Sequence, residues 1–460
     1  MTQVARSPLA GSQRTSIGDR MDRLPVTALH RSMTAFVGAG LFFDYFDSNL
    51  SGTVSKVLQT QFAVGGTTLM LFLASGFIGQ FVGSLVLGRL SDRLGRRRAF
   101  MLNLLTYSLF TLAGAFSPSA GWLIVTRFLA GLGIGAEQTL ADCYLAEVLP
   151  PAKRGRLIAW AYSLAFCGVP AVGFTALWLA PRSWLGVAGW RWVFVAGALG
   201  TVAVWLLRRG LIESPRWLAA RGRIAEADQL VRRLERQAGV VSEPLAPVAA
   251  AGVDRRPPGY RVLFSAGQRG RTLVLWTVCL LSVVAYYGFG TLAPQVLAVK
   301  GVDVVSGLGY TALTFLGYPF GSLLTVPVID RVERRVLICG AAVLMAASGL
   351  GFGLSADPVA VVVFGFLYTL LSNVFSTASH VFLAEQYPTE FRTTATGAAY
   401  SLSRLGAGVL PFVMIPILQH GGAGLLFTVI AGAMAVLVVV VGLFGQRTTG
   451  LSVDRHDQLS

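Results

Sequence analysis

The stretch GTTLMLFLASGFIGQFVGSLVL (66–87) has no charged residue, and it runs directly into GRLSDRLGRRR (88–98), which carries five arginines and one aspartate. A bilayer core about 30 Å thick needs about 20 apolar residues in helical form. Residues 66–87 therefore fit a membrane span that ends in a basic loop. The stretch AGLLFTVIAGAMAVLVVVVGLFG (423–445) is also uncharged and long enough to cross. The rest of the chain can be assigned outward from these two segments.

The composition agrees with a membrane protein. Of 460 residues, 54% are apolar and 13% are charged, and the mean hydropathy is +0.64. An ordinary soluble domain is about 25% charged, and a single soluble core stops growing beyond about 250–300 residues. This composition excludes a soluble two-domain enzyme, a disordered chain, a collagen-like repeat and a disulfide scaffold.

The cysteines lie in apolar stretches, with neither CxxC spacing nor a histidine cluster beside them. They are Cys143, Cys167, Cys279 and Cys339. This arrangement argues against a metal site and against a disulfide framework. We expect no metal and no cofactor.

Hydropathy predicts an all-α membrane protein with twelve transmembrane helices. The expected spans are 32–54, 66–88, 99–117, 121–146, 157–180, 190–210, 271–297, 307–329, 335–354, 358–384, 395–419 and 422–445. A polar stretch divides them six and six. The expected organisation is a tail (1–31), a first half (32–210), a central loop (211–270), a second half (271–445) and a second tail (446–460).

The positive charge predicts the orientation. With the N-terminus inside, cytoplasmic segments hold 32 of the 38 Lys and Arg residues and external segments hold four. Cytoplasmic loops are enriched in Lys and Arg, so we expect a multi-pass protein of the cytoplasmic (inner) membrane with both termini cytoplasmic. The net charge of +16 is then a feature of the surface facing anionic lipid, and no nucleic-acid partner is expected. Residues 1–31 lack a signal-peptide pattern, so the N-terminus should stay uncleaved.

Two pairs of segments repeat at one offset of 238 residues. GRLSDRLGRRR (88–98) matches VPVIDRVERRV (326–336), and YLAEVLPPAKRG (144–155) matches FLAEQYPTEFRT (382–393). Two separate matches at one offset indicate two pseudo-symmetric six-helix halves that arose by duplication. Parallel halves of this kind place the substrate site between them near mid-membrane.

These features resemble the major facilitator superfamily over almost the whole chain. RFLAGLGIGAE (127–137) and ESPRWL (213–218) are similar to motifs of its sugar-porter and metabolite:proton symporter branch, and residues 385–408 resemble nicotinate and aromatic-acid transporters. One position departs from that pattern. Aromatic-acid relatives carry Asp-Gly-(Tyr/Phe)-Asp in span one, whereas this chain has Asp44-Tyr45-Phe46-Asp47, which weighs against an aromatic-acid substrate.

Charged residues inside the spans are the candidates for proton coupling, because each costs about 2.5–3.5 kcal/mol on insertion scales. Asp44 and Asp47 share one helical face with Gly40 and Ser51, and a rise of 1.5 Å per residue places Asp47 at nearly the depth of Arg127. The resemblance implies such a span-one to span-four pair as the coupling pair; the alternative is a static ion pair. Asp44 is slightly favoured as the titrating group.

Glu137 lies near the middle of span four and matches a glutamate of nicotinate-type relatives. It is a candidate second proton carrier or a partner for a cationic substrate. The alternative is a carboxylate satisfied by the backbone and Gln138. Glycines 131, 133 and 135 before it favour close helix packing over ligand contact.

The candidate substrate residues centre on Arg404, near the middle of span eleven, because a guanidinium can bind a carboxylate with two parallel hydrogen bonds. The alternative is pairing with Glu385 or a backbone carbonyl. The other candidates are Tyr400, Gln138, Asn373, Tyr286 and Tyr287. Asn373 forms a stripe with Thr377 and His380, but His380 is expected to be solvated or to cap a helix.

The candidate gating residues are the charged groups of the repeated loops. They are Asp92, Arg93, Arg96, Arg97, Glu147, Arg154, Glu213, Arg216, Asp330, Arg331, Glu385 and Arg392. We expect Asp92 at a helix N-terminus, where the dipole favours an anion, and the arginines on carboxylates such as Glu147 or Glu213. The alternative is topology retention alone. Residues 216–238 are expected to form one amphipathic helix and 239–260 a flexible linker.

The prediction is a monomeric, non-enzymatic, proton-coupled transporter of a small organic metabolite, favoured as a carboxylate. Its expected partners are this substrate, protons and the lipid bilayer. The alternatives are a sugar, polyol or organic-cation transporter, coupled or not, and a proton-driven exporter. A sensor or membrane enzyme would need a catalytic constellation, and the sequence contains no HExxH, GxSxG or Walker motif.

Overall fold

The computed structural model describes residues 16–240, 263–265, 268–328, 331–385 and 392–445. In the first half the helices are α1 (Ile17–Asp22), α2 (Ala28–Phe62), α3 (Gly66–Leu94), α4 (Arg96–Ala115), α5 (Ala120–Gly135), α6 (Glu137–Val148), α7 (Pro151–Phe166), α8 (Gly168–Leu179) and α9 (Gly189–Arg208). The hairpin β1 (Ser183–Trp184) and β2 (Val187–Ala188) joins α8 to α9. After them come α10 (Pro215–Ala220), α11 (Ile224–Ala238), α12 (Arg269–Val299), α13 (Val304–Phe315), α14 (Gly317–Val328), α15 (Arg334–Leu354), α16 (Pro358–Glu385) and α17 (Arg392–Phe444).

Each predicted span coincides with a helix or with two consecutive helices. Spans four, five and eight are interrupted at Ala136, Cys167 and Leu316, where α5, α7 and α13 end. Spans eleven and twelve both lie in α17, which bends at Gly422 (φ 71°). Nine helical segments of the described chain are long and apolar enough to cross a membrane. The more polar α2 and α4 add two spans, and the last of the nine segments, in α17, contains two spans. The described helices therefore supply the twelve spans of a two-half fold.

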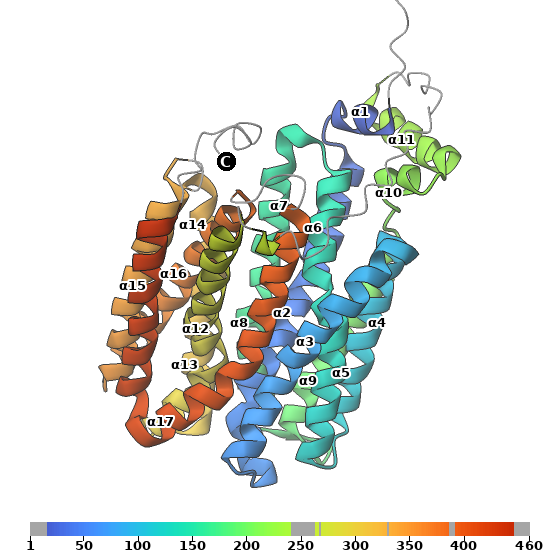
Figure 1. Cartoon of the computed structure of the whole chain (residues 1–460). Helices are drawn as coiled ribbons and strands as arrows, with labels where there is room; N and C mark the ends of the chain where they lie inside the picture. Colours follow the sequence, from blue (N-terminus) through green and yellow to red (C-terminus); the bar gives the residue numbers. More distant parts are fainter. Residues whose placement is uncertain (1–15, 241–262, 266–267, 329–330, 386–391, 446–460) are drawn as a thin grey trace, which may run out of the picture.

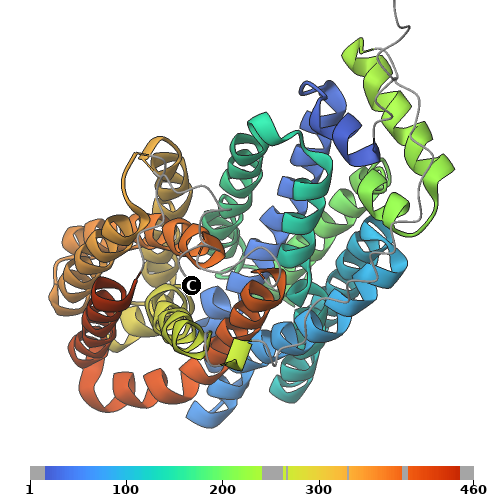
Figure 2. The same ribbon diagram turned by 45° about the horizontal axis from the view of Figure 1, so that its top comes forward.

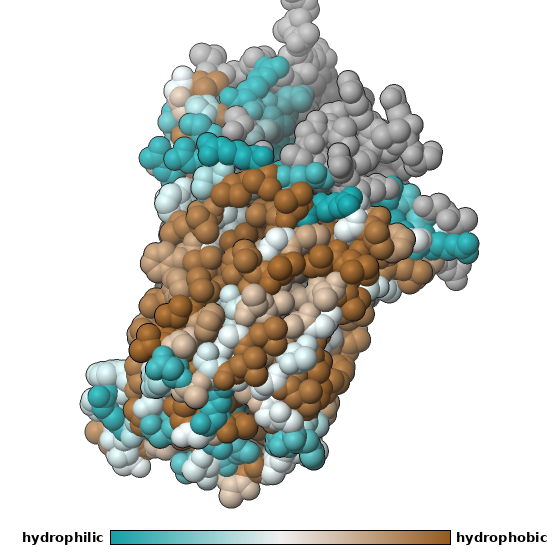
Figure 3. All heavy atoms as spheres, turned by 90° about the vertical axis from the view of Figure 1, so that its left-hand side faces the viewer, coloured by the Kyte–Doolittle hydropathy of each residue, from teal (hydrophilic) through white to brown (hydrophobic). Residues whose placement is uncertain are grey.

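The outer surface carries a wide apolar band. Figure 3 shows this band on the face formed by the second half, with hydrophilic residues at its two ends. Exposed members include Val343, Leu344, Val363, Val436 and Val439. A contiguous apolar surface of this size would aggregate in water, whereas lipid chains can cover it.

The two halves lie side by side. Figures 1 and 2 show the first half (blue to green) next to the second half (yellow to red). We call the end that carries α1, α10 and α11 the upper end, and the end where α17 bends the lower end (Figure 1). The halves contact each other through α2 with α12, α3 with α17, and α8 with α13.

Glycines allow two spans of the first half to approach closely. A Cβ added at Gly131 would lie 2.2 Å from the Gly76 carbonyl oxygen, and one at Gly135 would lie 2.1 Å from that of Gln80. Any side chain there would force α3 and α5 apart. The glycines before Glu137 therefore serve helix packing, as predicted.

The central loop forms two helices, not the single helix predicted for 216–238. The chain turns at Gly222 (φ 75°) between α10 and α11, because a glycine adopts this left-handed conformation without the strain of a Cβ. Arg20 of α1 joins this layer: its guanidinium donates to Glu235 at 2.7 Å and to Asp228 at 2.6 Å, and its side chain is buried. These hydrogen bonds raise the pKa of Arg20, the bond to Glu235 most strongly. Residues 241–260 of the predicted linker lie outside the described chain.

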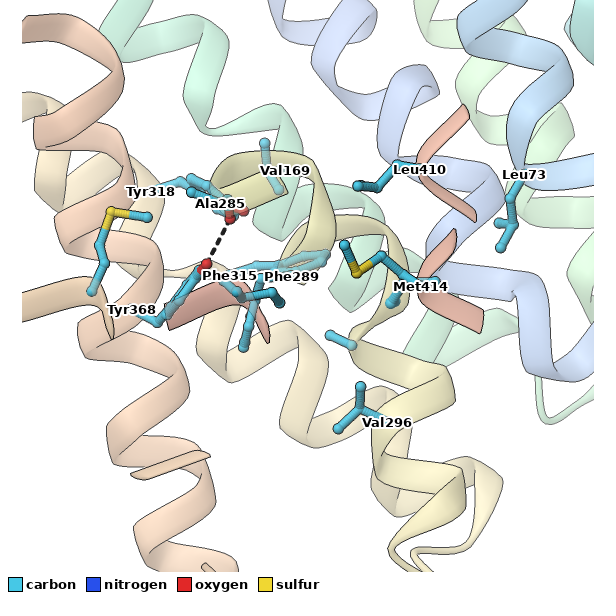
Figure 4. Close-up of a cluster of buried hydrophobic side chains, with 14 of the residues drawn as sticks. Leu73, Val169, Ala285, Phe289, Val296, Phe315, Tyr318, Tyr368, Leu410 and Met414 are labelled. Atoms are coloured by element: carbon cyan, nitrogen blue, oxygen red, sulfur yellow. Dashed lines mark hydrogen bonds between the residues drawn. The ribbon is translucent and has the colours of Figure 1, made fainter. Parts of the chain in front are cut away.

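An aromatic cluster fills the interior of the second half. Figure 4 shows Phe289 beside Tyr368, whose hydroxyl donates to the Ala285 carbonyl oxygen at 2.6 Å. The rings of Phe289 and Tyr368 are stacked with centroids 4.7 Å apart, and Phe352 and Phe427 pack around them. Leu73 and Val169 of the first half extend the same core, so the two halves share one apolar interior.

Candidate transport site

The predicted ion pair between spans one and four is present. Arg127 of α5 donates to both carboxylate oxygens of Asp47 on α2, at 3.1 and 3.0 Å. Thr111 of α4 donates to the same carboxylate at 2.7 Å and accepts from Arg127 at 2.8 Å. The ring of Phe194 lies under the guanidinium, 4.9 Å away. Both charged side chains are buried, and Nε of Arg127 donates to no described residue.

A second buried ion pair joins Glu137 to Arg208 of α9. Neither side chain has any exposed surface. The Arg208 guanidinium also donates to the carbonyl oxygens of Phe36 and Val37. The carboxylate stands in the first turn of α6, where the helix dipole favours an anion. Glu137 is thus paired with an arginine, not satisfied by Gln138.

Gly40 makes room for this second pair. A Cβ at Gly40 would lie 1.7 Å from Nη2 of Arg208, so only glycine lets the guanidinium pass beside α2. The predicted stripe on α2 therefore faces Arg208 at Gly40 and Arg127 at Asp47, one pair toward each end of the membrane.

Asp44 lies between the two pairs and has no ion-pair partner in the described part of the chain. It is 4% exposed, and its Oδ1 accepts no hydrogen bond from any described residue. An ionised carboxylate that is buried and unpaired is costly. Asp44 is therefore a described acidic residue of the first half whose charge the structure leaves uncompensated.

A central cavity lies between the halves and has two lobes. The arginine lobe, of about 80 Å3, is lined by Gln138, Tyr286, Tyr287 and Arg404 among others. The aspartate lobe, of about 680 Å3, extends toward the upper end and is lined by Asp142, Tyr162, Arg156 and Arg334 among others. The two lobes share Tyr45, Ser376, His380 and Tyr400 as a common wall.

Arg404 projects into the arginine lobe from α17. Its guanidinium donates to Oε1 of Gln138 at 2.7 Å and to the hydroxyl of Tyr287. Gln138 belongs to the first half and Arg404 to the second, so this contact crosses the cavity. No carboxylate of a described residue pairs with Arg404.

The other predicted substrate residues divide into two groups. Tyr286, Tyr287, Gln138 and Tyr400 line the cavity. Asn373 does not, because it is fully buried and donates to the Tyr318 carbonyl oxygen on α14 at 2.5 Å.

Three residues of the cavity wall differ from their predicted setting or were not predicted. His380 lines both lobes, with its ring 5.1 Å from that of Tyr400, so it neither caps a helix nor faces bulk solvent. Tyr45 packs its ring on Phe166 at 4.7 Å, which leaves the cavity open despite the missing glycine. Asp142 was missed: it accepts the Tyr162 hydroxyl at 2.6 Å, one helical turn beyond Gln138.

The described gating residues form contacts within the first half. Arg96 pairs with Glu147 at 2.8 Å, and the Glu213 carboxylate accepts the backbone N–H groups of Arg96 and Arg97 at 2.8 and 3.3 Å. Glu213 therefore supplies an anion at the N-terminus of α4; the anion predicted at a helix N-terminus was Asp92, whose side chain lies outside the described residues.

The other predicted gating residues pair with Asp22, are exposed, or have side chains outside the described residues. Arg154 and Arg216 pair with Asp22, at 3.8 and 2.6 Å. Arg93 and Arg331 are exposed. The side chains of Asp92, Asp330, Glu385 and Arg392 lie outside the described residues.

The lower end is sealed between the halves below the cavity. A Cβ at Gly52 of α2 would lie 2.9 Å from the Thr291 carbonyl oxygen of α12, and Gln295 donates to Ser55 at 3.1 Å. Above this seal a polar cavity of about 20 Å3 touches Asp47 and Arg127. That volume holds about one water molecule.

Comparisons with known proteins agree with this architecture. Residues 32–459 match the family model described as "Sugar (and other) transporter". YyaJ of Bacillus subtilis, whose name assigns it to metabolite transport, is 31% identical over 446 residues, covering 95% of this chain and 97% of its own. The niacin transporter NiaP of Acinetobacter baylyi is 29% identical, covering 95% and 98%. The fold is similar to the partially occluded, inward-open xylose transporter XylE of E. coli, with a TM-score of 0.73, 19% identity, and 93% and 100% of the two chains covered.

The chain belongs to the sugar (and other) transporter family of the major facilitator superfamily. It is a multi-pass integral membrane transporter and not an enzyme. The family model spans both halves and therefore includes the whole central cavity.

Proposed function

We propose that this protein moves a small organic carboxylate across the cytoplasmic membrane by proton-coupled alternating access. The observation that carries the substrate class is Arg404, a cation at the cavity between the halves without a carboxylate partner among the described residues. Guanidinium groups bind carboxylates in planar, two-bonded geometry. The relative NiaP, named a niacin transporter, supports an organic acid.

The present partners of Arg404 are neutral. Gln138 and the Tyr287 hydroxyl both act as acceptors that an incoming carboxylate can replace. Because Gln138 stands on the first half and Arg404 on the second, the release of Gln138 changes a contact that spans the cavity. Substrate binding is thereby linked to the relative position of the halves.

Proton coupling is assigned to the first half. Asp44 has no compensating partner, so a bound proton removes the cost of its charge. Asp47 is paired with Arg127, and rocking that separates the two would leave its carboxylate without its partner. The small polar cavity beside this pair offers a place for the water through which the proton could pass.

We place the upper end in the cytoplasm, because the basic loops of the described chain gather there. With this orientation the sealed lower end faces outside, and the aspartate lobe opens inward. The Arg96–Glu147 pair and the Glu213 cap would then stabilise the first half at its cytoplasmic rim and change when that rim closes.

Transport in proteoliposomes tests the coupling. In the wild-type protein an inward proton gradient should drive accumulation of the acid, and Asp44→Asn or Asp47→Asn should abolish the accumulation while leaving counterflow exchange. Thr60→Ala, at an exposed position of α2, is the matched control. Accumulation that persists in both Asn variants would remove proton coupling from the proposal.

Ligand-induced thermal stabilisation tests the substrate class. Organic acids should raise the melting temperature of the wild-type protein, and Arg404→Ala should lose this shift while Arg404→Lys should keep part of it. Stabilisation by amines or sugars alone would overturn the carboxylate assignment.

A sugar or polyol is the second candidate. The hydroxyl-rich wall, which includes Tyr45, Tyr286, Tyr287, Tyr400 and Ser282, can hydrogen-bond to a neutral polyol. An uncoupled facilitator of this kind predicts that neither Asp44→Asn nor Asp47→Asn changes the pH dependence of transport.

A further inference from the structure

The central cavity carries opposite charge in its two lobes. Arg404 stands in the arginine lobe and Asp142 in the aspartate lobe, and the lobes adjoin at the wall formed by Tyr45, His380 and Tyr400. A ligand whose carboxylate reaches Arg404 and whose far end passes between these side chains would approach Asp142.

One helix carries a residue at each end of this path. Gln138, which accepts from Arg404, and Asp142 are four residues apart on α6, so they project from the same face on successive turns. A carboxylate that takes the place of Gln138 at Arg404 would therefore lie about one helical turn from Asp142. A single six-membered ring with substituents at opposite ends matches such a rigid, short spacing.

Asp142 keeps hydrogen-bonding capacity for a ligand. Tyr162 donates to its Oδ1 at 2.6 Å. The other oxygen, Oδ2, accepts no hydrogen bond from a described residue and is not buried, so it faces the lobe that Asp142 lines. The same lobe is lined by Arg156 and Arg334, but neither forms an ion pair with Asp142 in the described chain.

An acidic side chain inside a membrane span is costly and calls for a functional explanation. Asp142 lies within the membrane-spanning segment Ala120–Val148, where ionisable residues are expensive and usually functional. Its partner Tyr162 orients the carboxylate without neutralising it, because a phenol donates a hydrogen bond but carries no positive charge.

We propose that Asp142 is a specificity-determining residue, which selects carboxylates that carry a hydrogen-bond donor at the end of the ring opposite the carboxylate. This inference rests on the proposed function, because Arg404 must first orient the acid. A donor such as a hydroxyl satisfies Oδ2, whereas an ether or a bare ring displaces water from Oδ2 without offering it a hydrogen bond.

Matched ligand pairs test the selection. Dissociation constants for purified protein would be measured at one pH with 4-hydroxybenzoate against 4-methoxybenzoate, and with 4-hydroxycyclohexanecarboxylate against 4-methoxycyclohexanecarboxylate. The second pair removes any dependence on an aromatic ring. The hydroxy acids should bind about tenfold more tightly, as expected for one hydrogen bond to a charged acceptor.

Variants of Asp142 and Tyr162 distinguish a role of Asp142 in ligand recognition from a structural role. Asp142→Ala should bring the hydroxy-to-methoxy ratio to about one by weakening only the hydroxy acids. Asp142→Asn, which keeps an acceptor and the shape of the side chain, should retain part of the preference. Tyr162→Phe frees Oδ1 as well and should not reduce the preference. If Asp142→Ala fails to fold, the ratio in Asp142→Asn still decides, because a merely structural residue would weaken both acids equally.

The outcomes distinguish this inference from the proposed function. If carboxylates bind and Arg404→Ala abolishes their binding, but the hydroxy acids are not preferred or the preference survives in Asp142→Ala, only the role of Asp142 is overturned. If no carboxylate binds the wild-type protein, while phenols, amines or sugars do, both the substrate class and the role of Asp142 are overturned.

Discussion

The two halves share one architecture but are stabilised inside by different interactions. The described spans of the first half enclose two ion pairs, Asp47 with Arg127 and Glu137 with Arg208, and the unpaired Asp44. The interior of the second half is a cluster of aromatic rings around Phe289. Charges in hydrocarbon are costly to keep and aromatic packing is not. The first half therefore contains the acidic groups proposed to change charge. The second half is a rigid, aromatic-packed domain relative to which the first half moves.

The largest expected effect comes from breaking the ion pair at Glu137. Arg208→Met should destabilise the protein by about 3–5 kcal/mol, because it leaves a fully buried carboxylate without its partner. The free energy of unfolding can be measured by SDS titration in mixed micelles.

A double variant shows whether the charge is the cause. Adding Glu137→Leu to Arg208→Met removes the stranded carboxylate and should restore most of the lost stability, because apolar replacements of buried pairs are often tolerated. A double variant no more stable than Arg208→Met would mean that the arginine acts through packing on Phe100, and the contrast between the halves would then weaken.

The next effect concerns the surface where the halves meet. Gly52→Leu should oppose closure of the lower end, because even a Cβ at this position would lie 2.9 Å from the Thr291 carbonyl oxygen. An overpacking cost of about 1–3 kcal/mol corresponds to a shift of about 5- to 150-fold between the two access states. Alkylation of a Ser51→Cys reporter from the lower side should accelerate accordingly. Gly432→Leu, on a glycine with no atoms within contact distance, is the control and should leave the alkylation rate unchanged.

A smaller effect is expected in the aromatic half. Tyr368→Phe removes the hydrogen bond to the Ala285 carbonyl oxygen and should cost about 1 kcal/mol. The loss should be the same at every pH between 5 and 8, because no ionisable partner is involved. Tyr310→Phe, whose hydroxyl has no described hydrogen bond, should be nearly neutral. A pH-dependent cost for Tyr368→Phe would show that a titrating group is coupled to this aromatic cluster.

The sequence predicted those parts of the fold and site that depend on spacing along one helix. Hydropathy located the twelve spans, and the rise per residue placed Asp47 and Arg127 at one depth, where the structure pairs them. The tyrosines at 286, 287 and 400 were assigned to the cavity because they lie beside Arg404 or near a glycine break, and they line it.

The sequence could not predict contacts that depend on how helices are rotated or on residues at span ends. Arg208 ends α9, so it was counted with the cytoplasmic positive charge, although its side chain turns inward through the space left at Gly40. Asp142 was overlooked near the upper end of span four for a similar reason. Asn373 and His380 were placed on one stripe, but they lie about two turns apart on α16 and meet different neighbours, so the first contacts α14 and the second lines the cavity.

The smallest expected effect lies outside the membrane, where α1 is bound to α11. Asp228 is partly desolvated, which by itself would raise its pKa, but hydrogen bonds from Arg20 and Arg232 outweigh this and lower the pKa below the usual 3.8. The ionised form therefore stabilises the docked state at neutral pH, and this contribution is lost as the pH falls below 3.8. Hydrogen exchange at α1 should accelerate over that range in the wild-type protein and should already be faster at pH 7 in Asp228→Asn. Since the spanning helices of the first half do not depend on this contact, their exchange should stay unchanged; acceleration there would mean that α1 and α11 stabilise the charged half itself.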